Sequence, residues 1–254
     1  MKNTTKTLLT IGAVAGFSFT AAQAATVFTG GTGSDFDSAW DNGLVSSTNP
    51  GTVDTSASGL VRATANFGGG WTIDHTAGDL DFSGGGWNVN GGVGSAATTS
   101  YNLSGGSIDV NGTGTQDRGN FLVNKITFNL SGGAVSSELT FGLANGGAMN
   151  FLAGSGTLDS AAFKTTSVGT MNFFSGWTGF ATVDSLDVSD WETLLATTLV
   201  GSTFDGVDIT TGNFADNFVV NGNTLTLFVP EPSSTALLGL GLSSLLMRRK
   251  RSAA

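Results

Sequence analysis

The chain has 254 residues and a formal net charge of −9, with 39 glycines, 3 prolines and no cysteine. The lack of cysteine excludes a disulfide-stapled scaffold, and so little proline without a three-residue period excludes a collagen-like chain. Its 18 phenylalanines and 5 tryptophans supply apolar side chains that disordered segments lack. This composition favours many short β-strands separated by glycine turns.

The first residues have the features of a signal peptide. Two lysines precede a mostly apolar core at 8–19, and Ala22-Gln23-Ala24 follows as a small-x-small cleavage site. We therefore expect residues 1–24 to be removed and the mature chain to begin at Ala25.

Removal of both ends makes the remaining body strongly acidic. Residues 25–229 contain four basic residues against 18 acidic ones, which leaves a net charge of −14. A surface with that charge repels nucleic acid and anionic lipid. We expect no nucleic-acid partner.

The start of the mature chain contains two local signals. Trp40 stands beside Asn42-Gly43, which is a turn signal, and we expect its ring to cover one open end of the core. Residues 30–37 nearly match the repeat of calcium-binding β-rolls, but Asp37 stands where that repeat needs a large apolar residue, and the segment occurs once. We expect an ordinary glycine loop there and no metal site.

From about 66 to 180 a strand-like run that ends in Ser-Gly recurs. Its copies are placed at 80–83, 101–104, 128–131, 151–155 and 171–175, with serines 21, 27, 24 and 20 residues apart. A repeat of about two dozen residues indicates a solenoid, in which each turn stacks on its neighbours.

Alternation within the runs predicts which side chains enter the core. Ile126, Phe128 and Leu130 alternate with polar residues and therefore share one face of a strand. We predict an all-β fold with a right-handed parallel β-helix over 25–180. Its repeats from about 66 to 180 give about five turns and a length of about 25 Å, because neighbouring strands lie about 4.8 Å apart. A β-sandwich built of hairpins is the alternative.

The segment 181–228 changes character. Residues 189–192 match the capping-box pattern, and apolar residues follow at helical spacing, which predicts a short helix at about 190–198. Residues 218–227 resemble two strands around Asn221-Gly222, a strong hairpin signal. We predict that this helix and hairpin cover the last turn of the solenoid.

Candidate catalytic groups are few. His75 is the single histidine, and its neighbour Asp74 lies on the opposite face of any strand, so we expect a surface histidine without a metal ion. Asp79 and Asp81 share a strand face and are the nearest approach to the carboxylate pair of a glycosidase. We expect these two side chains to be solvated, and we expect neither catalysis nor a cofactor.

The chain closes with three distinct parts. Pro230, Glu231 and Pro232 are followed by an uncharged segment at 233–247 and by Arg248-Arg249-Lys250-Arg251. A helix that spans a bilayer usually has about 20 residues, and this segment is shorter. It can still form a transmembrane helix if the bilayer thins around it. The basic residues are expected to stay in the cytoplasm and residues 25–229 to lie outside.

The order of a Pro-Glu-Pro signature, a short apolar segment and a basic stop resembles the PEP-CTERM sorting tail of exported bacterial proteins. The resemblance covers about the last two dozen residues. It implies that 229–254 directs sorting, that the chain passes through the inner membrane by residues 233–247, and that an exosortase-like enzyme recognises Pro230, Glu231 and Pro232 and cuts nearby.

Two sorting signals around a repeat-built body predict a non-catalytic exported protein of the cell surface or extracellular matrix, with exopolysaccharide as a candidate partner. One alternative is a carbohydrate-binding adhesin, in which Trp71, Trp87 and Trp177 would stack on sugar rings. The other is a β-helix polysaccharide lyase or glycosidase that would use Asp79 and Asp81.

Overall fold

The computed structural model describes residues 26–30, 39–41, 45, 50–58, 60, 70–83, 87–90, 99–111, 120–164 and 169–228, with side chains described for all of these except 87–90. The predicted signal peptide with Ala22, Ala24 and Ala25, most of the calcium-like segment, and the predicted tail from 229 onward lie outside these residues. No helix in the described part has the length and apolar character needed to cross a membrane.

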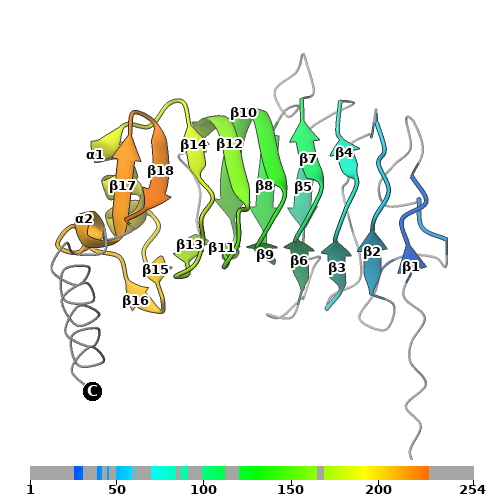
Figure 1. Ribbon diagram of the computed structural model, residues 1–254, viewed down its shortest axis with the longest axis horizontal. Helices are drawn as coiled ribbons and strands as arrows, with labels where there is room; N and C mark the ends of the chain where they lie inside the picture. The colour runs from blue at the N-terminus through cyan, green and yellow to red at the C-terminus, as the bar shows by residue number, and fades with distance from the viewer. Residues whose placement is uncertain are drawn as a thin grey trace, which may run out of the picture.

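One sheet runs along the whole described body (Figure 1). Its neighbouring strands are parallel except for the last pair, β15 and β16. In spatial order the strands are β1 (Thr26–Val27), β2 (Gly51–Val53), β3 (Thr72–His75), β6 (Ser100–Leu103), β9 (Thr127–Leu130), β11 (Gly147–Phe151), β13 (Gly169–Phe173), β15 (Thr203–Phe204) and β16 (Val207–Asp208).

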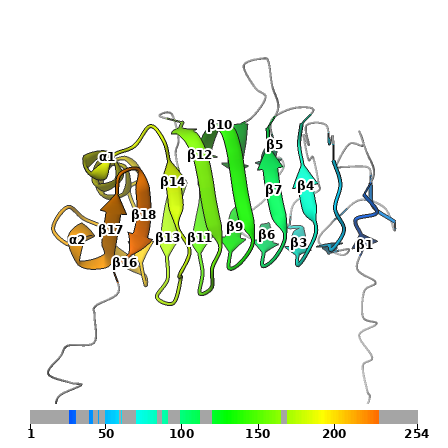
Figure 2. The ribbon, with the colours of Figure 1, turned by 45° about the horizontal axis from the view of Figure 1, so that its top comes forward.

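A second sheet lies beside the first and is seen in front in Figure 2. In the long strand β10 the register shifts between Ser137 and Thr140, so its first half pairs with β7 and its second half with β8. The second half, with β5 and β8, forms a third face. The strands are β4 (Asp79–Asp81), β5 (Trp87–Asn90), β7 (Ser107–Val110), β8 (Asn120–Asn124), β10 (Ala134–Ala144), β12 (Thr157–Phe163), β14 (Ala181–Val183), β17 (Phe218–Asn221) and β18 (Thr224–Leu227).

Each turn of the chain adds one strand to the first sheet and then one to the second. Successive turns begin with β3, β6, β9, β11 and β13, which gives a solenoid of about five turns. The parallel pairing confirms the predicted solenoid and rules out the β-sandwich of hairpins.

The core is a stack of inward side chains from successive turns. Ile126, Phe128 and Leu130 are buried, as the alternation predicts. The rings of Tyr101 and Phe128 stack with their centroids 5.1 Å apart. Burial of each such side chain contributes about 1.5–3 kcal/mol relative to exposure, so the stacked core is the main source of stability.

The register differs from the predicted repeat in two copies. Leu80 pairs with Ile108 in the second sheet, and β3 supplies the first-sheet strand of that turn. Phe151 pairs with Leu130, so the matching strand run begins at Met149 rather than at Phe151. The Ser-Gly pattern marks a corner of the solenoid, but each turn has more than one corner. These two copies were therefore wrongly aligned with the others.

Stacked glycines form one of these corners. Gly106 and Gly133 have positive φ angles of 76° and 72°. A Cβ atom at Gly106 would lie 2.0 Å from the carbonyl oxygen of Gly78, and one at Gly133 would lie 2.5 Å from that of Gly106. The corner therefore packs backbone directly on backbone, which only glycine permits.

The two ends of the solenoid are covered differently. At the N-terminal end Trp40 is buried and its ring meets Phe28 edge-on at 5.4 Å, in agreement with the predicted cover. At the other end, β18 pairs antiparallel with β14, and the helical elements lie beside this hairpin (Figure 1). These elements are α1 (Val188–Thr193), the π-helical η1 (Leu194–Thr198) and α2 (Phe214–Asn217).

The helix starts earlier than predicted. Asp187, rather than Ser189, is the N-cap, and its carboxylate accepts hydrogen bonds from the backbone N–H of Ser189 at 2.8 Å and of Asp190 at 3.1 Å. A carboxylate is favoured over a hydroxyl here because it also interacts with the positive end of the helix dipole. The capping box is therefore completed by Asp190 and not by Glu192.

The predicted hairpin is confirmed, with a loop one residue further on. Asn221 pairs with Thr224, so Gly222 and Asn223 form the loop. Gly222 has φ of 63° and takes the left-handed conformation that the turn needs.

Candidate functional site

A continuous ladder of side-chain amides runs along the outer face of the first sheet from β13 to β3. These side chains alternate with buried core residues, and each amide donates to the turn before it. The bonds run from Asn102 to Asp74 (2.7 Å), Asn129 to Asn102 (2.7 Å), Asn150 to Asn129 (2.8 Å) and Asn172 to Asn150 (2.9 Å).

The hydrogen-bonding capacity of this ladder is directed along the solenoid. An asparagine amide has two N–H donors and an oxygen with two lone pairs. Each asparagine of the ladder uses at least one donor and at least one lone pair. The recurring apolar-Asn-apolar pattern was visible in the sequence, but its meaning required the register. Apart from the Asp74 carboxylate at one end, the ladder is an uncharged structural element that ties successive turns together.

The outer face of the second sheet is acidic. Asp79 and Asp81 share this face, as predicted, and Asp81 pairs in register with Asp109. Hydroxyl donors accompany the row: Ser107 donates to Asp79 at 2.6 Å and Ser136 to Asp109 at 2.7 Å. Within the described residues no cluster of three or more His, Cys, Asp or Glu side chains could hold a metal ion.

The prediction of a surface histidine is wrong. His75 is fully buried in the interior of the solenoid. Asp74, the preceding residue of the same strand, lies on the outer face, as the alternation predicts. The Nδ1 of His75 lies 2.9 Å from the Tyr101 hydroxyl and its Nε2 lies 2.9 Å from the Gly78 carbonyl oxygen. Burial lowers the pKa of His75, so the ring is held neutral.

Two of the three tryptophans proposed as sugar-stacking platforms are core residues. Trp71 and Trp177 are buried, and Trp177 Nε1 donates to the carbonyl oxygen of Gly156 at 2.7 Å. The Trp87 side chain lies outside the described part of the structure. Neither Trp71 nor Trp177 can present its ring to a glycan.

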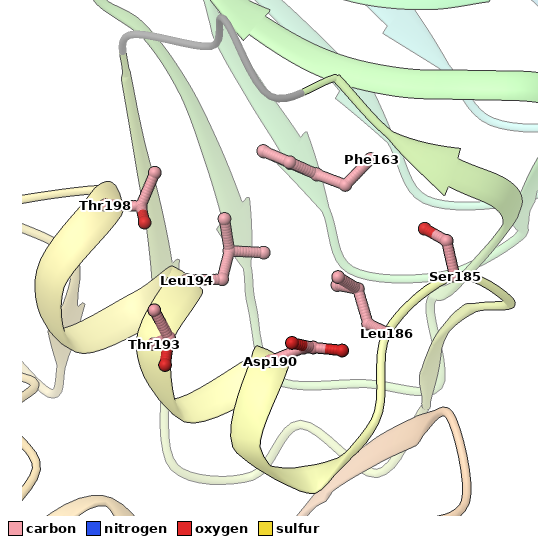
Figure 3. A pocket seen from close by; sticks show the side chains of 7 residues that line it. All are labelled: Phe163, Ser185, Leu186, Asp190, Thr193, Leu194 and Thr198. Carbon is pink, nitrogen blue, oxygen red and sulfur yellow. The ribbon is translucent and has the colours of Figure 1, made fainter.

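A hollow of about 450 Å³ lies between the end of β12 and the helical elements α1 and η1 (Figure 3). Its apolar side chains are Phe163 at the end of β12, Leu186 and Leu194. Its polar side chains are Ser185, Asp190, Thr193 and Thr198, all of them exposed. Sequence reasoning missed this hollow because its lining comes from three separate segments whose packing no local pattern reveals.

The described chain ends at the capped end of the solenoid. β18 ends at Leu227, and the backbone N–H of Phe228 donates to the Asn217 carbonyl oxygen at 2.8 Å. This bond holds Phe228 next to the cap.

Comparison with known families places a PEP-CTERM protein-sorting motif at residues 228–251. The match includes Pro230, Glu231 and Pro232 and the basic run from Arg248 to Arg251. No curated protein and no solved structure matches the chain. Fold and tail together define a β-solenoid with a C-terminal sorting motif, which confirms the resemblance seen in the sequence.

The motif implies export and processing by exosortase, a membrane enzyme, with sorting to the cell surface through a membrane-bound intermediate. Signal cleavage between Ala24 and Ala25 and the exact processing site within the tail stay predictions.

Proposed function

We propose that the protein is a non-catalytic structural component of the cell surface or extracellular matrix, where it associates with exopolysaccharide. The observation that supports this most is the amide ladder, because outward polar side chains bond to one another along the solenoid instead of converging on a substrate. Hydrolysis of a glycosidic bond needs two carboxyl groups that flank it.

The second sheet supports the same role. Asp79 accepts from Ser107, and Asp109 accepts from Ser136 and from Asn111 at 3.2 Å. These bonds supply donors to Asp79 and Asp109 on a regular face, whereas Oδ1 of Asp81 is buried and has no hydrogen-bond partner within the described residues. We therefore assign the row of carboxylates to solubility and to spacing between neighbouring molecules rather than to acid–base chemistry.

Complementation of a strain that lacks the protein tests this function. The variant Asp79→Asn/Asp81→Asn should restore matrix cohesion as well as the wild type, and the control Asp54→Asn/Asp208→Asn carries the same charge change elsewhere. A Pro230→Ala/Glu231→Ala/Pro232→Ala variant should leave the chain in the membrane fraction and restore nothing.

The opposite pattern would show an enzyme. Loss of cohesion with Asp79→Asn/Asp81→Asn at normal protein level, together with release of new sugar ends by the wild type but not by that variant, contradicts the proposed function.

A further inference from the structure

We infer that the hollow at the capped end binds one residue of a glycan that carries no acid group, with a protonated amino sugar preferred to a neutral one. This inference rests on the proposed matrix function and names the class of polysaccharide that the protein would hold.

The hollow has the size and composition of a ligand site. Its volume of about 450 Å³ lies within the range of about 300–1,000 Å³ typical of small-molecule pockets, which combine apolar walls with a few polar groups. Leu186, which is half-buried, forms the apolar wall together with Phe163 and Leu194, which are only 8% and 6% exposed. A sugar ring can place its C–H face against them.

The polar side chains around this wall match a polyol (Figure 3). Ser185, Thr193 and Thr198 each offer a hydroxyl that both donates and accepts. Asp190 is the single charged side chain of the lining. One of its carboxylate oxygens accepts from the backbone N–H of Asp187 at 3.1 Å, and the carboxylate has further lone pairs for a ligand hydroxyl or ammonium.

The π-helical turn explains why two threonines line the hollow together. The N–H of Leu199 donates to the carbonyl oxygen of Leu194 at 2.8 Å, an i to i+5 bond. Thr193 and Thr198 are also five residues apart and both line the hollow. In an α-helix of about 3.6 residues per turn, residues five apart lie on well-separated faces. The π-turn is therefore a local departure from regular α-helix that brings Thr193 and Thr198 to the same side, facing the hollow.

Charge decides which glycans fit. Residues 184–192 carry four carboxylates, and Lys164 is the single basic residue between 126 and 247. A uronic acid would be repelled from this end of the molecule, whereas an ammonium group would be attracted. The carboxylate of Asp190 is the partner expected for that ammonium.

Binding of three defined oligosaccharides to the purified mature protein tests the inference by calorimetry, at a pH where the amines are protonated. The probes are a chito-oligosaccharide with free amines, its neutral N-acetylated counterpart, and an oligogalacturonate. We expect binding to weaken in that order, with no binding of the oligogalacturonate.

Two pairs of variants locate the site. Asp190→Asn should weaken binding of the free-amine probe by about two- to fivefold, as expected for an exposed ion pair, and weaken binding of the neutral probe less, because the asparagine oxygen still accepts from a ligand hydroxyl. Glu192→Gln removes the same charge outside the lining and should change neither. Thr198→Phe should fill the hollow and abolish binding of both probes, whereas Thr197→Phe should not. Thr193→Phe replaces Thr198→Phe if circular dichroism shows that the latter is misfolded.

Equal or tighter binding of the oligogalacturonate, or full binding by a folded Thr198→Phe variant, would overturn the inference. If no probe binds but the native protein is found in the matrix, only this site assignment is wrong. If the probes bind as expected but the native protein never reaches the matrix, the proposed function is wrong and the binding site stands.

Discussion

His75 Nδ1 lies 2.9 Å from the hydroxyl oxygen of Tyr101, which belongs to the next turn of the solenoid. His75 itself pairs in register with Leu103, so the histidine occupies a position that the following turns fill with an apolar side chain. A polar pair thus replaces apolar packing in one layer of the bore.

Stability should fall in acid through this histidine. Burial lowers the pKa of His75 below 6.5, and the hydrogen bond to the Gly78 backbone and, less, the nearby charge of Asp79 offset part of that effect. At a pH between the folded and unfolded pKa values, His75 is therefore protonated in the unfolded chain and neutral in the folded chain. The contribution of His75 is intact above pH 6.5 and is lost as pH falls from there towards the folded pKa.

Urea unfolding between about pH 8 and about pH 5 measures this effect. The His75→Leu variant should lose this component of the pH dependence. It should also be less stable at neutral pH by about 1–3 kcal/mol, because the hydrogen bonds to Tyr101 and Gly78 are lost. Parallel pH profiles for the wild type and the variant would contradict the assignment.

The glycine corners should not tolerate a side chain. At Gly106 an added Cβ would meet the Gly78 carbonyl oxygen, so Gly106→Ala should lower the free energy of unfolding by more than about 3 kcal/mol. Gly146 has φ of 81° but open space around it, and Gly146→Ala should cost only about 1–2 kcal/mol of backbone strain. Similar losses in the two variants, measured by denaturant unfolding, would argue against a stacked corner.

The amide ladder should depend on the donor in each rung. Asn129→Asp removes the donor to Asn102 and places a carboxylate against its oxygen, which should cost about 1–3 kcal/mol. Asp74→Asn at the end of the ladder keeps the acceptor that Asn102 needs and should change stability little. Equal effects of the two substitutions on the free energy of unfolding would mean that the ladder contributes no directional bonding.

The hairpin should protect the last turn from self-association. Leu225 is fully buried and faces Ala181 of β14, so Leu225→Asp should detach the hairpin and expose an edge strand. Thr226→Asp adds the same charge at a half-buried position and should leave the chain monomeric. Light scattering after size exclusion distinguishes the outcomes, and a monomeric Leu225→Asp variant would show that the edge is protected by other means.

The sequence was informative where local chemistry decides the structure. Alternation placed Ile126, Phe128 and Leu130 correctly, and the tail motif could be recognised because its parts are contiguous. The register of Leu80 could not be predicted, since every corner of a solenoid favours the same small residues. His75 was misplaced because its burial depends on Tyr101 one turn away. The hollow beside α1 depends on contacts between distant segments in the same way.

Intact mass of the native protein from membrane and extracellular-matrix fractions tests the central claim most directly. We predict a chain that begins at Ala25, ends between Val229 and Pro232, and is found in the matrix fraction. A chain that extends to Ala254 and remains in the membrane fraction would contradict processing and the matrix role together.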